Sequence, residues 1–178
     1  MFSLTAAALA VDFAGRQLQE GEFQLPPTVS FSYGGATRTF LHQAATPVSS
    51  SLSALVIELH GFGGSKEIQW EFPTWRPFAP NRGIVVAWPD GISGSWNAGQ
   101  TWCGAAWSQQ ADDVGFIDEV ITRTSALHAI DSNRIYITGH SCGCSMAQRC
   151  ELVTHHHVPL LACANGSPPT DASCQVCY

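Results

Sequence analysis

Charge is scarce in this sequence, and basic charge is scarcest. Only 12% of the 178 residues are Asp, Glu, Lys or Arg, and the formal net charge is -6. No cluster of Lys or Arg is longer than two residues, so the basic surface on which nucleic-acid binding depends is missing. No apolar run approaches the roughly 20 residues that cross a bilayer. We therefore expect neither nucleic acid nor a membrane among the partners.

Cysteine, in contrast, is abundant. Seven Cys are high for a cytosolic chain and favour an oxidising compartment with some disulfides, while the odd count leaves at least one thiol unpaired. The N-terminal stretch has a short apolar centre but no positive region before it, so it is either a weak secretory signal or an apolar arm. We expect an extracellular protein and leave the disulfide pairing open among Cys103, Cys142, Cys144, Cys150, Cys163, Cys174 and Cys177.

The apolar pattern predicts an α/β domain. Residues 1–27 show no sustained period and end in two Pro, so we interpret them as an N-terminal arm and place the domain at 28–178. Alternation on either side of Gly34-Gly35 predicts a β-hairpin. Short apolar runs bounded by turn residues predict parallel strands covered on both faces. These runs lie at 54–59, 83–88, 134–138 and 158–164.

Helices are expected between these strands. Residues 112–129 carry apolar side chains at helical spacing behind two acidic residues, which is typical of an amphipathic helix with a favourable N-terminal charge. Asp112 and Asp113 are expected to cap this helix or to hold the neighbouring loop. Strands that alternate with helices imply right-handed crossovers. The predicted fold is a mostly parallel sheet with helices on both faces.

A serine motif follows the predicted strand at 134–138. The sequence reads Gly139-His140-Ser141-Cys142-Gly143, and a helical segment comes after it. Between a strand and a helix, G-x-S-x-G places the Ser on a sharp, strained turn, where larger residues two positions away would clash. The helix N-terminus also directs amides toward a developing negative charge. We predict Ser141 as a catalytic nucleophile, with a structural tight turn as the alternative.

A glycine-rich segment follows the predicted strand at 54–59 and reads His60-Gly61-Phe62-Gly63-Gly64. An oxyanion hole needs one amide after the nucleophile and one on a loop of this kind. We predict the backbone N–H groups of Phe62 and Cys142 as the two donors. A nucleotide site is disfavoured because neither G-x-G-x-x-G nor a Lys-Ser/Thr ending is present.

Four segments in chain order resemble the polyhydroxybutyrate depolymerase and feruloyl esterase-like group of secreted α/β-hydrolases. They read LHGFGGS, WPDGISGSWNAG, ADDVGFIDEVI and DSNRIYITGHSCGCSMAQRCE, and the resemblance extends over about residues 29–174. It implies an α/β-hydrolase fold and hydrolysis of hydroxycinnamate esters or polyesters through an acyl-enzyme on Ser141, with no cofactor and no metal. The sequence departs from the group at Cys142 and Cys144, where Asn and Gly are common.

The resemblance also implies a triad acid and a His downstream of Ser141, and no residue here matches either. His155-His156-His157 is the candidate substitute for the base and Asp171 for the acid. The His run, however, falls in a connection expected on the opposite side of the sheet, where a solvated loop fits better than a base or a metal site. We therefore expect a domain incomplete at its C-terminus, truncated after the nucleophile helix and the following strand, with low activity of its own.

The loop at 93–107 is long and rich in Gly and Trp, as loops near functional sites often are. Trp96 and Trp102 are predicted as aromatic walls for a phenolic or polymeric substrate, with a buried structural role as the alternative for each. His60 and His140 are expected to serve structure. Besides the serine esterase, a non-catalytic α/β-hydrolase-like binding protein and a peptidase remain open, and the sequence does not predict the oligomeric state.

Overall fold

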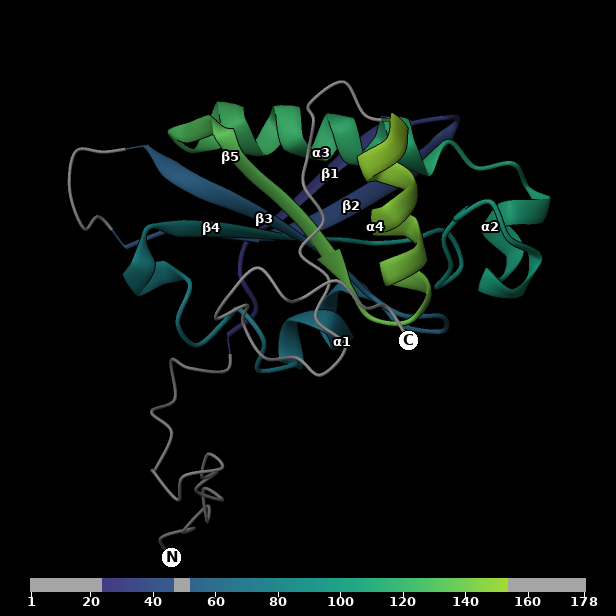
Figure 1. The fold of residues 1–178 in the computed structure, drawn as a ribbon, viewed down its shortest axis with the longest axis horizontal. Coiled ribbons are helices and arrows are strands. Elements are labelled where there is room, and N and C mark those ends of the chain that lie inside the picture. Colours follow the sequence, from purple (N-terminus) through teal and green to yellow (C-terminus); the bar gives the residue numbers. More distant parts are fainter. Residues whose placement is uncertain (1–23, 47–51, 154–178) are drawn as a thin grey trace, which may run out of the picture.

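The computed structural model describes residues 24–46 and 52–153. They form a five-stranded sheet with helices packed against it (Figure 1). No helix within these two ranges has the length and apolar character needed to span a bilayer. The strands are β1 (Thr28–Tyr33), β2 (Ala36–Gln43), β3 (Ser53–Leu59), β4 (Ile84–Pro89) and β5 (Ile130–Gly139), and the α-helices are α1 (Lys66–Glu71), α2 (Ala105–Ser108), α3 (Asp113–Leu127) and α4 (Cys142–Val153).

The sheet has the order β1-β2-β4-β3-β5. Strands β4, β3 and β5 are parallel, which confirms the parallel core predicted from the three apolar runs. The predicted hairpin is β1 and β2, and it joins β4 in antiparallel fashion, so the sheet is mixed. The fourth predicted strand, at 158–164, lies outside the described residues.

Both faces of the sheet are covered, which explains why its strands read as continuous apolar runs. Along β4, Val85 and Ala87 belong to the core under α3 and α4, whereas Val86 and Trp88 belong to a second core. Helix α1 contributes Trp70 to that second core. Figure 1 shows α3 and α4 on one side of the sheet and α1 on the other. The prediction of helices on both faces is therefore confirmed.

Helix α3 begins as its sequence predicts. Asp112 is the N-cap, and its carboxylate accepts a hydrogen bond of 3.0 Å from the amide of Gly115. The next carboxylate, on Asp113, is buried and pairs with Arg38 at 2.8 Å. Its other oxygen accepts a hydrogen bond from the amide of Asn97. The two acidic residues thus divide the predicted roles, because one caps the helix and the other holds the loop.

A carboxyl that no local sequence pattern predicts is buried between β3 and α1. Glu58 is 2% exposed and accepts hydrogen bonds from Gln69 Nε2 at 3.0 Å, from Trp88 Nε1 at 2.7 Å and from the Thr74 hydroxyl. Burial raises its pKa to about 7, although these three donors act in the opposite direction. In the folded state the Glu58 carboxyl therefore keeps its proton at a higher pH than an exposed glutamate does.

We predict that Glu58 makes the protein less stable as the pH rises from about 4.5 to about 7. In this window the unfolded chain has lost the Glu58 proton while the folded chain retains it, so ionisation favours unfolding. A shift of this size corresponds to about 3 kcal/mol. Urea unfolding of the wild type and of Glu58→Gln at pH 5 and pH 8 measures the effect. An unchanged pH dependence in Glu58→Gln would contradict the assignment.

Candidate active site

Ser141 lies on the turn between β5 and α4, in the position that the serine motif predicts. Its φ is 53°, in the left-handed region that non-glycine residues rarely adopt. The carbonyl of Ser141 accepts hydrogen bonds from the amides of Cys144 and Ser145, and that of His140 accepts one from Gly143. The side chain is exposed at the start of the helix. The predicted strained turn is confirmed.

The two motif glycines are required by close approach of backbone segments. A β-carbon added to Gly139 would lie 2.4 Å from the carbonyl carbon of Gly143. One added to Gly143 would lie 2.4 Å from the carbonyl oxygen of Leu59 and 2.6 Å from that of His60. No side chain fits at either position. The start of α4 therefore packs directly on the end of β3.

The glycine-rich loop lies against the serine turn. A β-carbon built on Gly61 would be 3.4 Å from the β-carbon of Ser141. The amide of Gly64 donates to the carbonyl of Gly61 at 3.1 Å, and Gly63 has a φ of 75°, as the third residue of a type II turn requires. Phe62 is at the tip of this turn. Its amide donates to no backbone carbonyl of the described residues.

The amide of Cys142 opens α4, directly after Ser141. The first amides of an α-helix have no partner within the helix, and this one donates to no backbone carbonyl in the described ranges. The predicted oxyanion donors thus lie on two different segments, because Cys142 directly follows Ser141 and Phe62 directly follows Gly61, which approaches Ser141. Within the described residues neither amide has a backbone acceptor, and the positive end of the α4 helix dipole favours negative charge near Cys142.

His60 anchors the glycine-rich loop and is not free to act as a base. The side chain is fully buried, its Nδ1–H donates to the carbonyl of Gly61 at 2.8 Å, and its Nε2 accepts from the amide of Gly91 at 2.9 Å. Burial lowers the pKa of this imidazole, and the Asp90 carboxylate at 3.8 Å opposes the effect only in part. His60 has the structural role that was predicted for it, and the lowered pKa favours its neutral form.

The two predicted aromatic walls have different positions. Trp96 is fully buried, donates from Nε1 to the carbonyl of His60 at 2.9 Å and packs on its ring at 4.8 Å between centroids. Trp96 therefore has the buried structural role and does not form an aromatic wall for a substrate. Trp102 is 55% exposed and donates to the side chain of Gln100. It precedes Cys103, which is bonded to the residue after Ser141.

A disulfide joins Cys103 to Cys142, with Cα atoms 5.5 Å apart. It connects the short 3-10 helix Thr101–Cys103 to the first residue of α4. The sequence predicted disulfides without predicting their pairing. Cys150, in contrast, is a buried free thiol whose pKa burial raises to about 12, so it is unreactive as a nucleophile.

Three exposed aromatic side chains lie on segments next to the serine turn, and we call them the aromatic rim. They are Phe62 at the tip of the glycine-rich turn, Trp102 beside the disulfide, and Phe72, whose ring stacks on that of His140 at 6.2 Å. Each is at least 47% exposed. Of the three, only Trp102 was predicted from the sequence as a substrate contact.

No histidine among the described residues forms a hydrogen bond to Ser141. The side chains of His42 and His128 are hydrogen-bonded to each other at 2.9 Å. This pair lies at the end of the sheet away from Ser141, because the residue after His128, Ala129, accepts a hydrogen bond from the amide of Ser53 at the start of β3. The His run at 155–157 and Asp171 lie outside the described residues. Within residues 24–46 and 52–153, no group of three or more His, Cys, Asp or Glu side chains is arranged to hold a metal.

A parallel core of β4, β3 and β5 covered by helices on both faces, with an antiparallel hairpin at one edge and a serine turn after β5, has the α/β-hydrolase fold. Solved structures agree. A thermostable esterase superposes with a TM-score of 0.59 at 17% identity, covering 74% of this chain and 38% of its own. A cold-adapted esterase from an Arctic intertidal metagenomic library superposes with a TM-score of 0.58 at 17% sequence identity. The match covers 75% of this chain and 58% of that esterase.

The S-formylglutathione hydrolase of Agrobacterium tumefaciens gives a TM-score of 0.54 at 17% identity, over 76% of this chain and 58% of its own. In sequence, the bifunctional acetylxylan esterase/xylanase XynS20E of Neocallimastix patriciarum is 29% identical over 91 residues, which are 51% of this chain and 12% of that protein. No protein-family model matches the chain. The chain spans 12% to 58% of the length of these four proteins.

We predict that Gly143→Ala destabilises the protein by about 3 kcal/mol, because the new methyl group would overlap the backbone carbonyl oxygens of Leu59 and His60. Urea unfolding measures the change. Ser145→Ala, on the same turn of α4, is the matched control and is expected to stay within about 0.5 kcal/mol of the wild type. A similar small effect for Gly143→Ala would show that the backbone contact is looser than described.

We predict that loss of the Cys103–Cys142 bond lowers the free energy of unfolding by about 4 kcal/mol, the chain-entropy value for a separation of 39 residues. Cys103→Ala, Cys142→Ala and the double variant should all lose about the same amount, because either single change breaks the bond. Denaturant unfolding of the three variants checks this. Additive losses would argue against a bond between these two residues.

Proposed function

We propose that this chain carries the nucleophile and the oxyanion donors of a serine carboxylic ester hydrolase, which acts through an acyl-enzyme on Ser141. The observation that supports the proposal most directly is the left-handed Ser141 at the head of α4, held there by glycines that no other residue can replace. The amides of Phe62 and Cys142 on either side support the same reading, because both are left without backbone partners among the described residues.

In the proposed reaction, the Oγ of Ser141 attacks the ester carbonyl carbon while a general base takes its proton. The carbonyl oxygen becomes an oxyanion and accepts hydrogen bonds from the amides of Phe62 and Cys142. Collapse of this intermediate expels the alcohol, which receives the proton, and leaves an acyl group on Ser141. Water then attacks the acyl-enzyme by the same route and releases the acid.

A serine hydroxyl needs a base to be an effective nucleophile. We propose that the base and its acidic partner come from outside the described residues, as the triad order of this fold implies. A second candidate function is a non-catalytic binding protein of the same fold. One observation favours it, namely that none of the described histidines is hydrogen-bonded to Ser141 and that both ring nitrogens of His60 are engaged.

For the substrate, we propose an ester with a bulky apolar or aromatic acyl part, such as a hydroxycinnamate ester or a polyester. The aromatic rim supports this, because Phe62, Phe72 and Trp102 expose large apolar surfaces next to Ser141. The partial match to a protein named as an acetylxylan esterase/xylanase supports a plant polysaccharide as the esterified alcohol.

We further propose that the protein acts outside the cell. The disulfide between Cys103 and Cys142 supports this compartment, because such bonds form and persist under oxidising conditions. The low charge of the chain does not distinguish between compartments.

We predict that a fluorescent fluorophosphonate probe labels the chain at Ser141 and that Ser141→Ala abolishes the labelling. The organophosphorus group reacts with activated serine hydroxyls, so labelling reports the nucleophile without requiring the natural ester. Gel fluorescence and mass spectrometry of the modified peptide measure the result.

Ser145→Ala serves as the control, because it removes a hydroxyl four residues along α4 and is expected to label like the wild type. Hydrolysis of p-nitrophenyl butyrate, followed on the same variants, reports turnover. A folded chain that takes up no label would show that these 178 residues do not activate Ser141, which overturns the proposal for this chain and favours the binding protein. Labelling that survives in Ser141→Ala would place the nucleophile elsewhere.

A further inference from the structure

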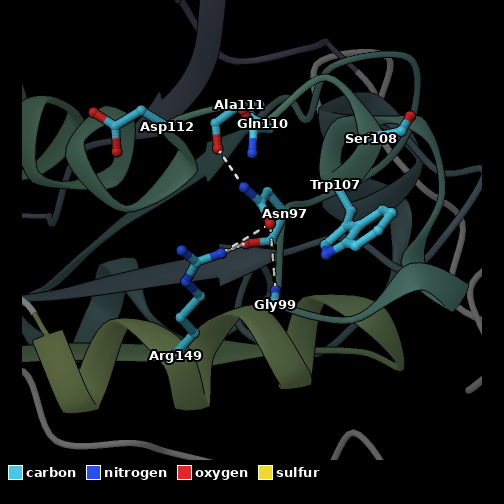
Figure 2. Close-up of a pocket in the computed structure, with 8 residues that line it drawn as sticks. All are labelled: Asn97, Gly99, Trp107, Ser108, Gln110, Ala111, Asp112 and Arg149. Carbon is cyan, nitrogen blue, oxygen red and sulfur yellow. Dashed lines mark hydrogen bonds between the residues drawn. The ribbon is translucent and has the colours of Figure 1, made fainter.

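A pocket of about 530 Å³ lies beside α4, away from the serine turn. Asn97, Trp107, Gln110, Asp112 and Arg149 are among the residues that line it. Figure 2 shows Arg149 reaching from α4 to Asn97, with the indole of Trp107 on one side and Asp112 on the other. The mechanism proposed above uses none of these side chains.

The floor of the pocket is fixed by hydrogen bonds that link distant parts of the chain. Arg149 Nη1 donates to both the backbone carbonyl and the side-chain oxygen of Asn97, the latter at 2.8 Å. The side-chain amide of Asn97 donates to the carbonyl of Ala111 at 2.8 Å, and its backbone amide donates to Asp113. These bonds hold the polar groups in place before any ligand arrives, which lowers the entropic cost of binding.

The walls offer one flat apolar surface and several spare polar groups. Trp107 is 41% exposed, and its indole N–H forms no hydrogen bond within the described residues. Only Nη1 of the Arg149 guanidinium is engaged there, so Nε and Nη2 remain as donors. The Asp112 carboxylate accepts from Tyr33 and Gly115, and each of its oxygens can accept a second hydrogen bond.

The charges of the pocket lining balance, so neither sign of ligand charge is favoured. Arg149 contributes the positive charge and Asp112 the negative one, so the lining is close to neutral. A flat aromatic face suits the C–H face of a sugar ring, and the surrounding amide, carboxylate and guanidinium groups suit its hydroxyls. A neutral ring that carries many hydroxyl groups meets all of these features, whereas the attraction of Arg149 for a phosphate or uronate would be offset by the Asp112 carboxylate.

We propose that this pocket binds a neutral saccharide unit. The inference rests on the proposed ester hydrolase, for which the saccharide belongs to the alcohol part of the substrate. Arg149 is eight residues beyond Ser141, which along α4 is roughly 12 Å. One sugar ring cannot reach both, so the pocket holds a unit of the chain at a distance from the ester. It positions a polysaccharide across the face of α4.

Binding of xylohexaose to the Ser141→Ala form of the 178-residue chain tests the proposal by titration calorimetry. This variant removes hydrolysis from the measurement, so binding is scored separately from esterase activity. We expect saturable binding that Trp107→Ala, added to this background, weakens about fivefold to tenfold through loss of the ring face. Trp107 is partly exposed, and circular dichroism verifies that the variant is folded.

Gln109→Ala is the matched control, because Gln109 is an exposed neighbour of Gln110 that does not line the pocket. Added to Ser141→Ala, it is expected to leave the affinity for xylohexaose unchanged. Absence of saturable binding, or binding that Trp107→Ala leaves unchanged, would overturn the proposal. Tighter binding of tetragalacturonate than of xylohexaose would overturn the neutral class of ligand. A failed fluorophosphonate test with intact xylohexaose binding would reject the esterase alone and retain the pocket.

Discussion

The end of β3 and the start of α4 meet backbone to backbone, and the geometry of the site depends on this contact. Gly143 has no room for a β-carbon against the carbonyl oxygens of Leu59 and His60. The same approach forces Ser141 into the left-handed region and presents it at the helix N-terminus. Because the glycine-rich loop also begins at the end of β3, one contact fixes both the nucleophile and the loop that faces it.

His60 extends that contact into the rest of the fold. Its imidazole binds its own loop through Gly61 and the segment after β4 through Gly91, while Trp96 donates to its carbonyl. A protonated imidazole could not accept from the Gly91 amide, so burial that keeps the ring neutral also keeps the loop in place. The histidine next to the oxyanion loop therefore acts on the site through structure.

Much of this arrangement could be predicted because local patterns determined it. The apolar runs specified strands covered on both faces, and two glycines around Ser141 specified its turn. Contacts between distant residues left no local signal. The pairing of Cys103 with Cys142 is one choice among many for seven cysteines, and Arg149 contacts Asn97 across 52 positions. Likewise, nothing in their sequence context distinguishes a buried Trp96 from an exposed Trp102.

The disulfide has a mechanical consequence for turnover. Trp102 stands on a segment that is bonded to Cys142, whose amide is a proposed oxyanion donor. A bulky substrate that displaces this segment transmits the displacement through a covalent bond to the donor, and substrate contacts that hold the segment still also hold the donor still. Affinity and catalytic rate are then coupled, so changes in the length or composition of this loop would alter how fast an ester is cleaved as well as which ester is bound.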